Sequence, residues 1–387
     1  MAAPANILGI ARQQTVFAVK ETTKGTLAFP SAAAPFIIAA GYPDMNQTPS
    51  FTNSEEIRNS RDVLSQFQDM TPAGSFSLPL YVRPSGTAGS APMGDVVLES
   101  LVGLKTVTSG TSVAYSPAIT KPSFSLWTKK GHTMFFAAGA VAEQMSVSAQ
   151  NKGGIKLDIS GSFLRLGWAG RDAVAATASA AATTVTVHDA KKYTVGAVIH
   201  NATKSDHGTN GYTVTGVNTS TNVLTISPAV PAGGWDISDV LEGYLPAGTE
   251  VGTPLESRKT TATVGGVSKV AQSISITYGD QVKMLDDEMT TTGYPADYVE
   301  SDRSVSGTIS TYFRQDDMAQ FVDGLAGNDK AVVITFGDTA GSKLEISMPK
   351  CKLQVPKVST SAPTVNLNVD YTALGTNGED SIALTFK

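Results

Sequence analysis

The segment GSFSLPLYVR (residues 74–83) alternates apolar with polar side chains, and GTISTYFR (residues 307–314) repeats this alternation in the second half of the chain. A period of two is typical of a strand that buries one face. Similar runs occur at 183–190, 273–279 and 364–371, and clusters of Gly, Pro, Asn and Ser between the runs favour turns. The chain is therefore predicted to be all-β.

Two short segments have helical periodicity and predict one short helix in each half of the chain. They span residues 94–103 and 317–327, and each ends in a Gly, the residue type that most often caps a helix C-terminus. The apolar faces consist of Val97, Leu98 and Leu101 in the first segment and of Met318, Phe321, Val322 and Leu325 in the second.

The order of strand, helix and further strands occurs twice, which predicts an internal duplication. Aligning Gly103 with Gly327 superimposes the two predicted helices, and the related strands before them align Phe76 with Ile309. Downstream, residues 155–167 match the later strand at 364–371 and the residues that follow it. Residue identity between the halves is low, and the composition that all strands share would by itself produce part of this match.

Residues 174–256 have a different character from both halves. An Ala-rich stretch precedes them, Gly and Pro are frequent near their end, and 3 basic and 7 acidic residues give them a formal charge of -4. We interpret them as a small, solvent-exposed β domain inserted between the copies. The predicted organisation is an N-terminal arm (1–35), a first copy (36–173), the insert (174–256) and a second copy (257–387), each copy being β-sandwich or barrel-like.

Composition excludes several classes of protein. A net charge of -5 over 387 residues argues against a nucleic-acid-binding protein, because such proteins usually carry an excess of basic residues. The most apolar stretches, residues 32–40 and 134–142, fall short of the ~18–20 residues that a membrane span needs. The start of the chain lacks the basic and apolar regions of a signal peptide. The single cysteine, Cys351, excludes an intramolecular disulfide and fits a reducing cytoplasm.

The sequence contains none of the common catalytic motifs that we sought: no GxSxG, HExxH, CxxC or P-loop pattern occurs. His188, His200 and His207 fit no compact metal motif, and the acidic run that begins at Asp286 has Thr291 where a calcium loop requires Gly. A pair of carboxylates for glycoside hydrolysis stays open, since their separation depends on the fold. We therefore expect no enzyme, no metal site and no cofactor.

Two long polar segments, residues 50–70 and 278–303, lie just before the strands quoted at the outset. Loops of this length in compact domains are usually functional or disordered. Together with the duplication and the order of elements, they make the chain resemble the tail tube (major tail) proteins of long-tailed bacteriophages. The opening residues 7–30 also resemble the N-terminal arms of that family. The duplication departs from the commoner members, which have a single copy.

The resemblance implies a structural virion protein that polymerises into stacked rings and forms the tail tube, the conduit for DNA ejection. The implied partners are further copies of the chain, a tape-measure protein inside the tube, and tail terminator and distal tail proteins at its ends. Double-stranded DNA would pass without specific binding, and no membrane insertion is expected. The protein would be made in the host cytoplasm and reside in the virion tail.

Because single-copy relatives close as six-membered rings, two copies in one chain imply rings of three chains, with the insert displayed outside. The two long loops would make the contacts between rings, and basic residues would receive the acidic loop across an interface; solvated charges are the alternative. The expected loop contacts are Phe51, Glu55, Glu56, Arg58, Arg61, Asp62, Phe67, Met284, Asp286, Asp287, Glu288 and Tyr294, and the expected basic residues are Lys350, Lys352, Lys129 and Lys130.

Two other functions remain open at this point. One is an all-β adhesin or carbohydrate-binding surface protein, and the other is an enzyme built on a β-sandwich or β-helix. Electron microscopy of the concentrated protein separates the readings, because tubes or rings favour the tail tube and dispersed monomers that bind glycans favour the adhesin.

Overall fold

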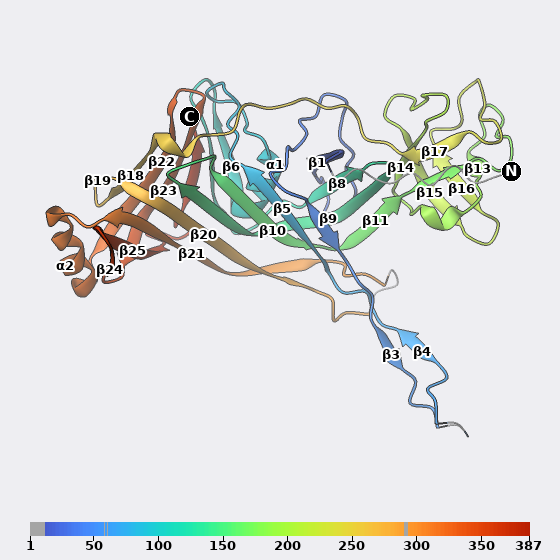
Figure 1. The fold of residues 1–387 in the computed structure, drawn as a ribbon. Coiled ribbons are helices and arrows are strands. Elements are labelled where there is room, and N and C mark those ends of the chain that lie inside the picture. Colours follow the sequence, from blue (N-terminus) through green and yellow to red (C-terminus); the bar gives the residue numbers. More distant parts are fainter. Residues whose placement is uncertain (1–11, 58, 60, 290–292) are drawn as a thin grey trace.

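The computed structural model describes residues 12–57, 59, 61–289 and 293–387 (Figure 1). Strands make up 52% and helices 7% of the described residues, so the all-β prediction is confirmed. The molecule is elongated: a six-stranded unit lies at one end, helix α2 lies at the other, and the hairpin of β3 (Phe51–Asn53) and β4 (Gln66–Gln68) projects away from the body (Figure 1).

One layer is a long antiparallel sheet built from strands of both halves. The six inner strands bury the side chains of one face, as the period of two predicts, whereas the two edge strands stay largely exposed. Its strands pair in the order β2 (Asp44–Asn46), β5 (Gly74–Tyr81), β10 (Lys156–Phe163), β9 (Thr133–Gln150), β20 (Ala271–Met284), β21 (Tyr298–Tyr312), β25 (Thr364–Leu374) and β24 (Lys357–Ser361).

Further strands form a second layer over the apolar face of this sheet. A single core of buried side chains, including Phe76, Val147, Ile276 and Ile309, extends through both halves. The second-layer strands pair in two series. The first series runs in the order β1 (Gln14–Lys20), β8 (Phe124–Lys130), β9 and β11 (Arg165–Ala169). The second runs in the order β19 (Val267–Lys269), β18 (Thr260–Val264), β22 (Asp329–Thr339), β23 (Ser342–Leu353), β26 (Ala383–Phe386), β7 (Ser112–Pro117) and β6 (Gly103–Thr108).

Both predicted helices form, as α1 (Asp95–Val102) and α2 (Met318–Ala326), and each is followed by its predicted Gly. The apolar face of α1, Val97, Leu98 and Leu101, is buried. The apolar face of α2 is not, because Met318, Val322 and Leu325 are 55%, 63% and 78% exposed and Phe321 is only partly buried. The reason is local: the β6–β7 hairpin contacts α1, whereas only Gly327 and Asn328 separate α2 from β22.

A separate six-stranded sheet spans residues 171–243, and its core around Trp235 and Tyr212 is continuous with buried side chains of the first half, among them Phe17, Trp127 and Phe136. Apart from its first strand, it lies within the predicted insert, whose boundaries stay a prediction. Its strands pair in the order β12 (Arg171–Ala173), β17 (Val240–Gly243), β14 (Val198–Asn201), β15 (Tyr212–Asn218), β16 (Val223–Ser227) and β13 (Thr184–Thr186).

The two halves meet where β9 pairs with β20, and a buried ion pair lies beside this seam. Lys121 Nζ is 3.2 Å from Asp280 Oδ2, and both side chains are almost fully buried. The lysine also donates to the carbonyl of Ala142, and Arg303 Nε lies 3.4 Å from the same Asp280 oxygen. Burial lowers the pKa of Lys121, against the opposing effect of Asp280.

Replacing Lys121 by Met should therefore destabilise the subunit, because it leaves Asp280 buried with only the more distant Arg303 as a cationic partner. Removing one member of a buried pair costs about 3–5 kcal/mol. Urea unfolding of the soluble subunit measures the effect, and Lys121→Met with Asp280→Asn should recover part of it. Lys283→Met, which breaks an exposed pair with Asp287, is the matched control. A loss below about 1 kcal/mol for Lys121→Met would contradict this view of the seam.

Candidate assembly surfaces

The solvent-facing side of the long sheet is a continuous surface of small polar side chains, here called the Ser/Thr face. Its residues lie directly opposite one another across neighbouring strands. One row runs Asp158, Ser146, Thr277, Ser306 and Thr372, and another runs Lys156, Ser148, Ser275, Thr308 and Asp370. Both rows cross from the first half to the second without interruption.

Charges are sparse on the Ser/Thr face and are partly neutralised. Lys357 Nζ lies 2.9 Å from Asp370, and Thr308 donates to the same carboxylate. Apart from Lys156, Asp158 and this pair, the rows through β10, β9, β20, β21 and β25 carry hydroxyl and amide groups. The alternation in residues 273–279 and 364–371 predicts one polar side for each strand, but the sequence does not tell that these sides join into one face.

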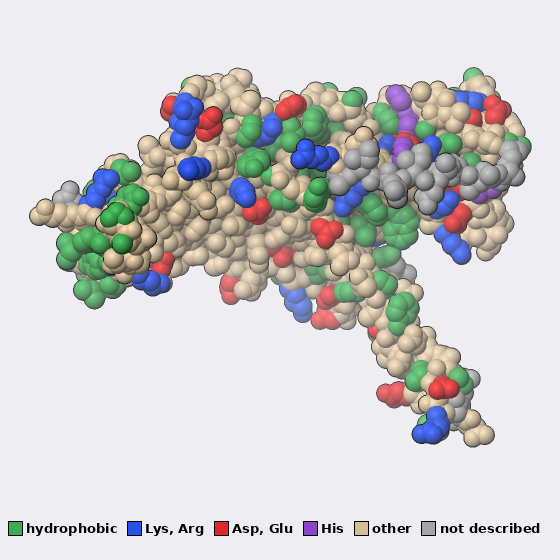
Figure 2. Space-filling view, in the orientation of Figure 1, with side chains coloured by type: hydrophobic (Ala, Val, Ile, Leu, Met, Phe, Trp, Pro, Cys, Tyr) green, Lys and Arg blue, Asp and Glu red, His purple; other side chains and the backbone are tan. Residues whose placement is uncertain are grey.

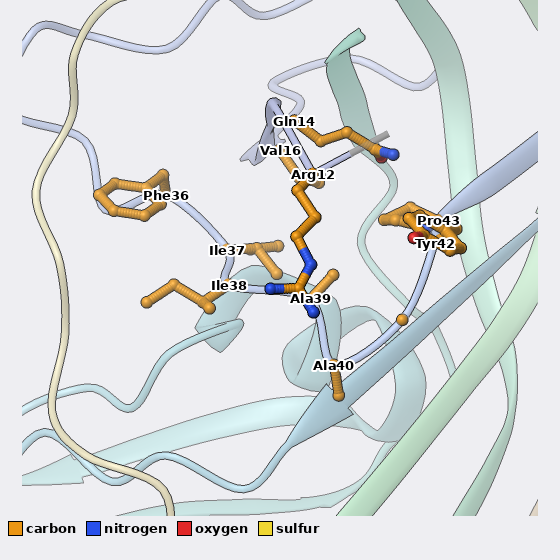
Figure 3. A pocket seen from close by; sticks show the side chains of 11 residues that line it. Arg12, Gln14, Val16, Phe36, Ile37, Ile38, Ala39, Ala40, Tyr42 and Pro43 are labelled. Carbon is orange, nitrogen blue, oxygen red and sulfur yellow. The ribbon is translucent and has the colours of Figure 1, made fainter. Parts of the chain in front are cut away.

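The long sheet ends in a strand with an open edge on each side. Within the described residues, β2 pairs with β5 alone, and β24 pairs with β25 alone. Beside β2 lies a groove between residues 12–16 and 36–43, in which the side chain of Arg12 extends past Ile37 and Ala39 (Figure 3). Val358 of β24 is 51% exposed, so both edges present apolar side chains as well as unpaired backbone.

The first long loop, residues 50–70, carries the β3–β4 hairpin and is called the arm from here on; it is distinct from the N-terminal arm of residues 1–35. Phe51, Ile57 and Phe67 are 56%, 100% and 62% exposed, which is unusual for large apolar side chains on a thin hairpin. The other expected contact residues within the arm, Glu55, Glu56, Arg61 and Asp62, are exposed too, and Arg58 lies outside the described residues.

The second long loop is shorter than expected. The prediction of a loop over 278–303 is wrong, because β20 continues to Met284 and β21 begins at Tyr298, which pair with each other. Met284 is only 7% exposed and packs with Val141, Leu164 and Tyr298, so its side chain belongs to the core of its own chain rather than to an outer contact.

The remaining turn of this hairpin carries the acidic residues that the sequence singled out. Asp286, Asp287 and Glu288 are exposed, and Tyr294 is half-buried. The turn is anchored to the first half, because Lys24 bonds Asp297 at 2.5 Å and lies over the ring of Tyr298.

The four basic residues that were expected to receive acidic loops have partners within the chain. Lys350 and Lys352 both reach Asp329, at 3.6 and 2.6 Å. Lys129 lies 3.3 Å from Glu242, and Lys130 donates to the carbonyl of Pro43. These contacts fix the side chains locally, and a role between chains stays a prediction.

Glu242 forms the polar contact between the six-stranded unit and the first half. Its carboxylate lies 2.8 Å from His132, 3.3 Å from Lys129 and 3.4 Å from His200. Although burial would raise it, the pKa of Glu242 is lowered to about 2 by these neighbours. Among the described residues, no group of three or more His, Cys, Asp or Glu side chains is placed to hold a metal ion. No described helix is long and apolar enough to cross a membrane.

The contribution of the contact around Glu242 to the free energy of unfolding should depend on pH. The folded pKa lies below the ordinary value of 4.5, so the carboxylate stabilises the fold at and above that pH, and the contribution is lost as the pH falls towards 2. The full effect is of order 3 kcal/mol. Urea unfolding at a series of pH values between 6 and 2 measures it. Glu242→Gln should be less stable at pH 6 and should lose the part of the pH dependence that Glu242 contributes, so its stability should approach that of the wild type as the pH falls towards 2; a constant difference from the wild type across the window would contradict the assignment.

Comparison with known families gives one finding. The family model described as phage tail tube protein matches residues 11–373, which is nearly the whole chain. A comparison with curated protein sequences gives no significant match.

Proposed function

The chain belongs to the phage tail tube protein family, and from this premise we propose how it builds the wall of the tube. As a member, it is a structural protein of the virion tail that assembles with itself into a tube together with other tail proteins. We propose that three copies form each ring, with the two halves of every chain in equivalent places. The family match gives no support to the adhesin alternative.

The observation that carries this proposal is the seam between the halves. Strands of the first half pair in the order β2, β5, β10 and β9, and those of the second half pair in the order β20, β21, β25 and β24. Seven residue pairs join β9 to β20, from Gln144 with Gly279 to Gln150 with Ser273. An equivalent seam between chains would join β24 of one copy to β2 of the next, and it would use both open edges.

Equivalent positions give the register of this second seam. Phe76 lies opposite Gly161 in the first half, as Ile309 lies opposite Val369 in the second. Extending this match along each sheet places Ser361 and Asn46 where Ser148 and Ser275 pair in the internal seam.

The grooves support the same pairing. The cleft beside the start of β20 is lined by Ala149, Gln150 and Asn151 from the first half. The equivalent groove beside β2 (Figure 3) is lined only by residues between 12 and 43. A strand from another chain would take there the place that the end of β9 takes in the internal seam.

The size of the wall supports three chains rather than two. Three chains would supply about 24 strands, and a spacing of about 4.8 Å gives a diameter of about 37 Å before strand tilt widens it. Side chains occupy about 5 Å on each side, which leaves a bore of about 27 Å. Two chains would leave a bore of only about 14 Å. The major and minor grooves of B-DNA have a combined depth of roughly 16 Å, and the duplex is at least this wide, so it would not fit.

In this arrangement the Ser/Thr face lines the bore. Each basic contact with phosphate releases counterions and strengthens binding, so a passage for DNA must offer few of them. Hydroxyl groups and few charges meet this requirement. The tape-measure protein would lie against the same face before ejection, and terminator and distal tail proteins would bind the end rings.

We further propose that the arm reaches the adjacent ring and that the six-stranded unit is displayed outside the wall. Exposed Phe51, Ile57 and Phe67 give the arm an apolar surface that the free subunit leaves uncovered. The six-stranded unit forms a sheet of its own at one end of the molecule and joins the first half through β11, Glu242 and a shared apolar cluster, so it would add bulk or weak host-surface contact without adding strands to the wall.

Engineered disulfides test the ring. With Asn46→Cys and Ser361→Cys in the same chain, mild oxidation of assembled tubes should link chains covalently, and the products should stop at trimers because the ring is closed. The natural Cys351 is buried, so it should contribute little background. Ser148→Cys with Ser275→Cys is the internal control and should link only within a chain. Absence of linkage, or ladders beyond three chains, would rule the arrangement out.

Hydrogen exchange tests the arm. Amides of residues 55–57 and 61–64 should exchange quickly in the isolated subunit and slowly in tubes, because the apolar arm is then covered by the adjacent ring. Amides of 144–150, already paired in the internal seam, serve as the control and should be protected in both states. Equal exchange of the arm in subunits and tubes would show that it makes no contact between rings.

A further inference from the structure

Helix α2 presents an apolar surface that nothing in the described chain covers. Met318, Val322 and Leu325, here called the α2 stripe, follow one another at intervals of four and three residues and therefore share one side of the helix. Their exposed fractions of 55%, 63% and 78% are high for such residues. Figure 2 shows apolar side chains gathered at the end of the molecule where Figure 1 places α2.

The equivalent helix of the first half is covered. With Gly103 aligned to Gly327, Leu98 and Leu101 of α1 correspond to Val322 and Leu325, and they are only 2% and 0% exposed. The β6–β7 hairpin, which contacts α1, continues to the second half by pairing β7 with β26. Since only Gly327 and Asn328 separate α2 from β22, no hairpin follows α2, and the described residues leave the α2 stripe open to another molecule.

The position of α2 indicates which molecule supplies the cover. The helix packs against the chain between β23 and β24, because a Cβ at Gly324 would lie 2.9 Å from the carbonyl oxygen of Gln354. Val355 and Val358 nearby are 43% and 51% exposed. The α2 stripe and the open edge of β24 thus lie at the same end of the molecule.

Charge at this end does not favour a nucleic acid or another highly charged occupant. Asp323 pairs with Lys330 at 3.0 Å, and Asp329 pairs with Lys352 at 2.6 Å and with Lys350 at 3.6 Å. Most of these charges neutralise one another, and the α2 stripe beside them is apolar. An apolar protein surface is the complementary occupant.

We propose that the α2 stripe is covered by the first half of the next copy in the same ring, the copy whose β2 pairs with β24. This inference rests on the proposed ring. A strand that pairs with β24 brings its own half against the same end of the molecule, and the neighbour's cover then replaces the hairpin that α2 lacks. The contact is lateral, within a ring, and is distinct from the contact that the arm makes between rings.

The test compares substitutions on the stripe with matched ones elsewhere. Val322→Asp with Leu325→Asp should leave the subunit folded, since both residues are exposed, and should raise the protein concentration needed for tube formation by about tenfold or more. Val322→Ala with Leu325→Ala should act in the same direction more weakly. Val195→Asp with Ile237→Asp, at sites 46% and 41% exposed on the six-stranded unit, should assemble like the wild type.

Circular dichroism checks folding, and sedimentation with electron microscopy measures assembly. Hydrogen exchange of residues 318–326 in the wild type, which should slow on assembly, gives a readout that needs no variant. Tubes formed by the Asp variant at wild-type concentrations, or unchanged exchange in α2, would overturn this inference and leave the proposed ring intact. Isolated rings that fail to stack would place the stripe between rings and would overturn it too. A wild-type protein that forms no tubes under any condition would overturn both proposals.

Discussion

The pairing of β9 with β20 is the interaction on which the rest of the structure depends. It joins two halves with the same order of strands into one sheet, and the Lys121–Asp280 pair buries charge beside it. In the order of the sheet, β9 is the last strand of the first half and β20 is the first strand of the second half. Pairing them leaves an open edge at each end of the sheet. A chain of this kind can always add another copy, and only the curvature of the sheet decides whether the assembly closes.

Two properties of the tube wall follow from that sheet. Side chains of one face are buried in the shared core, so the other face is free to serve transport, and its rows of Ser and Thr run across the seam without a change in character. In the proposed ring this face lines the lumen, where hydroxyl groups beside few lysines would bind phosphate weakly. Assembly and conduction would then use different parts of the same strands, the edges for assembly and the polar face for conduction.

Much of the fold could be predicted from sequence because the determining signals are local. Alternation in residues 74–81 and 364–371 specifies strands, and the Gly residues at 103 and 327 mark the ends of both helices. The family resemblance, reached from these elements, agrees with the family match.

What the sequence did not predict depends on contacts between distant segments. The exposure of Leu325 reflects the absence of a hairpin that only the first half possesses. Met284 lies in a polar segment that resembles a loop, yet it pairs with Tyr298 and is buried. Lys350 and Lys352 reach Asp329 because β22 and β23 pair, which spacing alone does not reveal. The joined Ser/Thr face likewise requires the register of neighbouring strands.

Cryo-electron microscopy of assembled tubes tests the central claim most directly: the account predicts three chains in each ring and an unbroken inner sheet in which β24 of one chain hydrogen-bonds with β2 of the next. Six chains in a ring, or a gap between these two edges, would contradict it.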